Sequence, residues 1–142
     1  MKGKIGKRMS IVLFSGTIDK LMAASILTTG AVAMDMEVDL FATFWGLNSL
    51  RKDMVKSNTR FSRDFEEMAG PMMQLFKSKN VPSWYETLKK AKESGTVRVH
   101  ACSLASDLMD LKKEDLDEIV DDIVGVGSYI SQADEASITL FI

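Results

Sequence analysis

The feature that most constrains this chain is the order of two kinds of stretch along the sequence. Short stretches that are apolar, or in which apolar and polar residues alternate, take turns with stretches whose apolar residues recur at helical spacing. Parallel strands need long crossover connections, usually helices, so this order predicts a three-layer α/β/α sandwich with a mostly parallel five-stranded sheet. The expected strands are Met9–Phe14, Glu37–Thr43, Thr96–Ala101, Ile119–Val124 and Ser137–Ile142. The expected helices are Leu21–Met34, the stretch from Pro82 to Gly95, and a short one around Ser128–Glu135.

The chain length of 142 residues fits one domain, so we expect a single domain over residues 1–142. Residues 52–80 do not fit the alternation, and we expect them to form a helical insertion within that domain. Phe61, Phe65, Met68 and Met72 recur at helical spacing, and Gly70-Pro71 is expected to divide the stretch into two helices. The insertion is either a hairpin packed on the domain or a lid or subunit contact.

Composition excludes several classes of site. One cysteine excludes an intramolecular disulfide, and one histidine excludes most histidine-based metal sites, so we expect no metal and no cofactor. The net charge of −2 gives no reason to expect nucleic-acid binding. Residues 101–142 carry a net charge of −8 against +6 for residues 1–100, and this acidic segment is either a solvated face or a docking surface for a basic partner.

The amino-terminal region resembles a secretory signal, but Asp19 and Lys20 interrupt its apolar stretch. The apolar run Leu21–Met34 has 14 residues, fewer than the roughly 20 needed to span a bilayer. We therefore expect a cytoplasmic protein without a membrane span.

Ligands and chemistry in parallel sheets lie beyond the carboxyl ends of the strands. The single cysteine, Cys102, follows a predicted strand and precedes a helical stretch, where amide groups favour the reactive thiolate. Cys102 is thus the expected catalytic residue, although many free cysteines are merely buried and inert. His100 lies two residues earlier on the same strand face, and it either tunes the thiolate or is a structural histidine. The expected substrate-binding residues at the strand ends are Ser15, Gly16, Phe44, Trp45, Gly46 and Ser103.

Three segments in the right order resemble the DsrE/DsrF-like family of sulfur-relay proteins. They are Gly30–Met34 with Glu37-Val38, Phe41–Leu47, and Ala101–Met109, which contains Cys102. The resemblance implies an α/β/α sandwich that assembles as a trimer or hexamer. It also implies that Cys102 accepts sulfane sulfur as a persulfide from a rhodanese or passes it to a TusA-like sulfur carrier.

The leading hypothesis is therefore a cytoplasmic sulfur carrier or sulfurtransferase component that holds a persulfide on Cys102. One alternative is a non-enzymatic module that binds a small ligand or nucleotide at the strand ends, although Ser15-Gly16-Thr17 is neither a G-x-G-x-x-G nor a Walker loop. Another is a scaffold subunit that acts through the insertion at residues 52–80.

Overall fold

The computed structural model describes residues 7–142. Its strands form one five-stranded sheet, as predicted, and every pairing in it is parallel. The strand order is β4-β3-β2-β1-β5. The strands are β1 (Arg8–Leu13), β2 (Glu37–Ala42), β3 (Val97–Cys102), β4 (Asp122–Val124) and β5 (Ile138–Phe141). The helices are α1 (Ile18–Ala33), α2 (Phe44–Asn48), α3 (Ala69–Ser78), α4 (Trp84–Ser94), α5 (Ser103–Leu108) and α6 (Val126–Ala133), with 3-10 turns at Arg63–Met68 and Lys113–Asp115.

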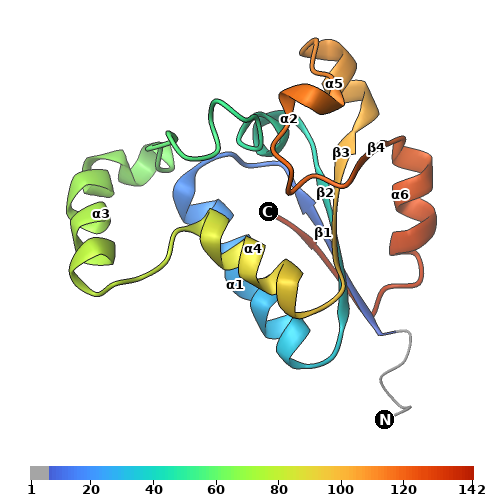
Figure 1. The fold of residues 1–142 in the computed structure, drawn as a ribbon, viewed down its shortest axis with the longest axis horizontal. Helices are drawn as coiled ribbons and strands as arrows, with labels where there is room; N and C mark the ends of the chain where they lie inside the picture. The colour runs from blue at the N-terminus through green and yellow to red at the C-terminus, as the bar shows by residue number, and fades with distance from the viewer. Residues whose placement is uncertain (1–6) are drawn as a thin grey trace.

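Helices α1 and α4 lie together on one face of the sheet, and α6 lies on the other (Figure 1). Side chains alternate along each strand, so β1, β2 and β3 each present one set of residues to the α1 and α4 face. That set is apolar and buried, and it forms the main core: Ile11, Leu13, Val38, Leu40, Val97 and Val99. The buried hydroxyl of Ser25 links the two helices because it donates a hydrogen bond to the Trp84 carbonyl at 2.9 Å.

The fourth strand is shorter than predicted. Ile119 and Val120 are buried, but they belong to the connection before β4 rather than to the strand. The backbone turns there, where the Val120 amide donates to the Asp117 carbonyl, so pairing with β3 begins only at Asp122. The apolar character of these two residues therefore extended the predicted strand too far toward the amino terminus.

The segment at residues 52–80 contains turns, the Arg63–Met68 3-10 turn and α3, and α3 stands away from the sheet (Figure 1). The predicted division into two helical pieces is found just before Gly70-Pro71, because the 3-10 turn ends at Met68 and α3 begins at Ala69. Pro71 is tolerated because it is in the first turn, where backbone N–H groups have no intrahelical partner. No helix in the part of the chain that the structure describes is long and apolar enough to cross a membrane.

Candidate functional site

Cys102 is the last residue of β3 and the N-cap residue of α5, as the sequence predicted. The Ser106 hydroxyl donates a 2.9 Å hydrogen bond to the Cys102 carbonyl, which fixes the junction between strand and helix. Only 6% of the cysteine surface is exposed, and its thiol makes no capping hydrogen bond to the first turn of α5. The chain thus places its one thiol just below the surface at the carboxyl end of the sheet.

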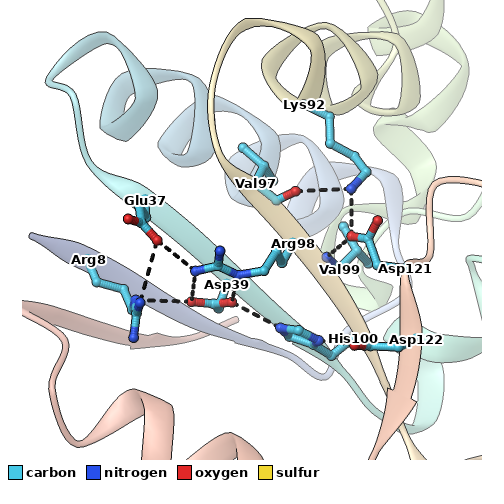
Figure 2. A network of polar contacts seen from close by, with 10 residues as sticks. All are labelled: Arg8, Glu37, Asp39, Lys92, Val97, Arg98, Val99, His100, Asp121 and Asp122. Atoms are coloured by element: carbon cyan, nitrogen blue, oxygen red, sulfur yellow. Dashed lines mark hydrogen bonds and ion pairs between the residues drawn. The ribbon is translucent and has the colours of Figure 1, made fainter. Parts of the chain in front are cut away.

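His100 lies on the same face of β3 as Cys102, but its ring nitrogens contact carboxylates (Figure 2). Nε2 is 2.9 Å from Asp39 Oδ1 on β2, and Nδ1 is 2.6 Å from Asp122 Oδ1 on β4. Only the imidazolium form has a proton on both nitrogens, so only that form donates to both carboxylates. The geometry therefore favours a buried, positively charged ring that joins three neighbouring strands.

Asp39 is fully buried and is the centre of a wider network (Figure 2). Arg98 Nε donates to Asp39 Oδ1 at 2.8 Å, and Arg98 Nη2 donates to Glu37 at 2.8 Å. Arg8 Nε lies 3.3 Å from Asp39 Oδ2. Burial alone would raise the pKa of the Asp39 carboxyl, but the hydrogen bonds from His100 and Arg98 outweigh it and lower that pKa to about 2.

The charges in this network balance only when His100 is protonated. Three carboxylates, those of Glu37, Asp39 and Asp122, then face three cations. The hydrogen bond to Asp39 raises the pKa of His100, burial opposes this, and Asp122 raises it further. The network is therefore a cluster of ion pairs. Within residues 7–142, no group of three or more histidine, cysteine or acidic side chains is arranged to hold a metal ion.

This arrangement bears on the predicted role of His100. Both ring nitrogens are engaged by carboxylates, so the ring does not use a nitrogen to contact the sulfur in this structure. Its positive charge is nevertheless two residues from Cys102 on the same strand face, which corresponds to about 6–7 Å between α-carbons. A catalytic role for His100 therefore stays a prediction. In this structure such a role would act on the Cys102 thiol through the charge of the ring and not through a hydrogen bond.

Three of the six predicted substrate-binding residues line one cavity, and the other three do not. Ser15, Gly16 and Trp45 line a cavity of about 770 Å³ beyond the ends of β1 and β2, which Cys102 and His100 do not line. Gly46 is buried, and a Cβ at this position would collide with the Leu13 carbonyl, so it serves the packing of α2 against β1. Ser103 is half-buried at the start of α5, directly after the cysteine.

Phe44 belongs to an aromatic cluster at the same end of the sheet. Its ring centroid is 5.8 Å from that of Phe14 and 6.3 Å from that of Trp45. Phe14 in turn stacks on Phe141 of β5, which is 71% exposed. The sequence prediction missed Phe14 and Phe141, because the pairing of β1 with β5 across the sheet brings together residues from the two ends of the chain.

The polar network was also missed. The sequence carried a signal for it, because Asp39 interrupts an otherwise apolar strand and a buried carboxylate needs partners. The identity of those partners depends on register, which pairs Asp39 with Arg98 and His100 with Asp122. Spacing along the chain alone does not give that register.

With this geometry established, comparison with known proteins identifies the family. The sequence pattern of the DsrE/DsrF/DrsH-like family matches residues 6–141. The chain belongs to the DsrE/DsrF/DrsH-like family. It is 38% identical to the uncharacterized protein YrkE of Bacillus subtilis (strain 168), over 96% of this chain and 97% of that protein.

A more distant relative is named for its function. The chain is 27% identical to the sulfur carrier protein DsrE2 of Allochromatium vinosum, over 96% of this chain and 98% of that protein. Among solved structures, it is similar to MTH1491 of Methanobacterium thermoautotrophicum, a protein of unknown function, with a TM-score of 0.57 and 19% identity over 96% of this chain and 97% of that one. That similarity shows the fold alone.

Proposed function

We propose that this protein is a cytoplasmic sulfur carrier that holds sulfane sulfur as a persulfide on Cys102. The observation that carries the proposal is the position of its one cysteine, at the carboxyl end of β3 and the start of α5, in a chain of the DsrE/DsrF/DrsH-like family. A relative named as a sulfur carrier supports the same chemistry. We expect His100 to favour the thiolate through its positive charge, and Ser103 to lie beside the transferred sulfur.

The transfer consists of two thiol–persulfide exchanges. The Cys102 thiolate attacks the outer sulfur of a donor persulfide, the S–S bond of the donor breaks, and the donor thiolate leaves. Cys102 then carries one additional sulfur atom. An acceptor thiolate attacks that outer sulfur, a new S–S bond forms on the acceptor, and the Cys102 thiolate is released. The sequence resemblance implies a rhodanese as donor and a TusA-like protein as acceptor, and no separate oxidant is needed.

Intact-mass spectrometry after incubation with a persulfide donor tests this chemistry. We expect an increase of roughly 32 Da, one sulfur atom, on the wild-type chain and none on Cys102→Ser. The matched control is Ser94→Ala, at an exposed serine at the end of α4, which keeps the thiol and should still be loaded. If Cys102 is found only as a sulfenic acid or as a mixed disulfide with the donor thiol, the chain does not carry sulfane sulfur.

We further propose a homo-oligomer, a trimer or hexamer, formed through the face that carries α6. Val126 and Ile130 are one helical turn apart on α6, and both are exposed. Phe141 on the edge strand β5 is exposed as well. Light scattering after size-exclusion chromatography should show a trimer or hexamer for the wild type and a smaller species for Ile130→Glu. A wild-type monomer would contradict the proposal.

We propose contact with another protein as a second role, through the segment at residues 52–80, which we treat as a helical insertion in a single domain. α3 has no buried residue, and its exposed side chains include Met73 and Leu75. Such a helix is suited to contact another protein. Pull-down of a partner should then be lost in Met73→Glu/Leu75→Glu and retained in Cys102→Ser, and the opposite result would assign partner binding to the thiol.

A further inference from the structure

We propose that the cavity beyond β1 and β2 binds a phosphorylated compound with a planar ring, of the nucleotide class. The cavity has a volume of about 770 Å³ and is bounded by the β1–α1 turn, by α2 and by the segment at residues 58–64. That volume is in the usual range for small-molecule sites, and the carboxyl ends of parallel strands are where such sheets bind ligands. The site is separate from Cys102 and independent of sulfur transfer.

The charge around the cavity favours an anion. Lys20, Arg60 and Arg63 line it, and Asp64 is the one acidic residue among its lining residues, which leaves a net charge of +2. Across residues 7–142, none of these three cations forms an ion pair, in contrast to Arg98, whose guanidinium is paired with Glu37 and Asp39. Unpaired arginines are suited to phosphate, which a guanidinium contacts through two parallel hydrogen bonds.

The cavity also offers a surface for a ring. Trp45 lines it and is 57% exposed, although tryptophan is a residue that folding usually buries. Its position is fixed, because the next residue, Gly46, donates its amide hydrogen to the Phe14 carbonyl at 2.8 Å and Phe44 packs edge-on against the indole. A planar base can stack on such an indole while its phosphate reaches the cations.

The backbone that carries Arg60 is held in place before any ligand arrives. Asn58 Nδ2 donates to the Gly16 carbonyl at 2.8 Å, and the Ile18 amide donates to the Arg60 carbonyl at 2.7 Å. The Ser62 hydroxyl donates to Asp19 at 2.6 Å, which occupies the Asp19 carboxylate. These bonds fix the backbone of residues 58–62 on the β1–α1 turn, so binding requires little ordering of that segment.

The experiment uses the full chain and ADP as the probe, followed by tryptophan fluorescence. Trp84 is buried, so a change caused by stacking reports on Trp45. We expect saturable quenching, with inorganic phosphate at least about tenfold weaker because it lacks a ring. Arg60→Gln/Arg63→Gln should weaken ADP binding at least about tenfold. Lys90→Gln, an exposed lysine outside this cavity, is the matched control and should bind as the wild type does.

Trp45→Leu has lost the fluorescent reporter, so its ADP binding is measured by calorimetry. This variant should bind ADP at least about fivefold more weakly than the wild type. Absence of saturable ADP binding would overturn the proposal. Equal binding by the double arginine variant and the wild type, or by phosphate and ADP, would overturn it too. Cys102→Ser should bind ADP unchanged, so failure here is distinguishable from failure of the sulfur-carrier proposal.

Discussion

The two faces of the sheet are built from the same strands but by different physical means. On the face covered by α1 and α4, the strands present branched apolar residues such as Leu40 and Val99, and burial of apolar surface holds the layers together. On the α6 face, the same strands present Asp39, Arg98 and His100, which are joined by ion pairs. The first face stabilises the fold through buried apolar side chains, whereas the second adds an ion-pair network, next to the one thiol, to the stack of Phe41 on Tyr129.

The comparison predicts the largest effect for Asp39→Asn. This change leaves Arg98 and His100 facing a neutral amide in a buried position, which we expect to cost about 3–5 kcal/mol in the free energy of unfolding. Urea denaturation measures it. Asp122→Asn is the matched control, because it removes the other carboxylate on the same ring at a half-exposed position, and it should cost under about 1 kcal/mol. Equal effects of the two variants would show that burial is not what makes the network important.

The second-largest loss in the free energy of unfolding is expected for a substitution on the apolar face. Val99→Ala removes two methyl groups from a fully buried side chain adjacent to His100 in sequence, and it should cost about 2 kcal/mol. Because no charge changes, the loss in unfolding free energy should be the same at pH 6 and pH 9. A loss that depends on pH would mean that the two faces are coupled through β3.

A smaller effect is expected from pH itself. The pKa of His100 is raised in the folded state, so its contribution to stability is fully present below its unfolded pKa and is lost as pH rises through the folded pKa. The Asp39 pKa is lowered to about 2, so its contribution is present above the unfolded value and is lost as pH falls toward 2. The urea midpoint should be highest at pH values between the acid-side loss due to Asp39 and the alkaline-side loss due to His100. His100→Gln should remove only the loss of stability on the alkaline side. An unchanged alkaline loss in His100→Gln would assign it to another group.

The sequence was sufficient for the features that depend on local periodicity. The alternation of strands and helices gave the parallel sheet, and Cys102 was placed correctly at a strand end because its flanking residues change from period two to helical spacing. The segment at residues 52–80 was harder. Phe61 is buried whereas Phe65 is exposed, although both belong to one predicted stripe, because the chain there is not a continuous helix.

The parts that could not be predicted depend on pairing between distant strands. His100 meets Asp39 and Asp122 only through the register of three strands, and Phe14 meets Phe141 only because β5 returns to pair with β1. The cavity likewise requires residues 58–64 to fold back on the β1–α1 turn through Asn58 and Arg60. Spacing within one segment contains none of this information.

The most direct test of the account counts the sulfur that the chain carries and passes on. The protein is loaded with a persulfide donor, separated from it, and treated with cyanide, which removes sulfane sulfur as thiocyanate. We predict one thiocyanate per wild-type chain, none for Cys102→Ser, and loss of the signal after incubation with an acceptor thiol that gains the sulfur. Thiocyanate from Cys102→Ser equal to that from the wild type, or none from either, would contradict the assignment of sulfur carriage to Cys102.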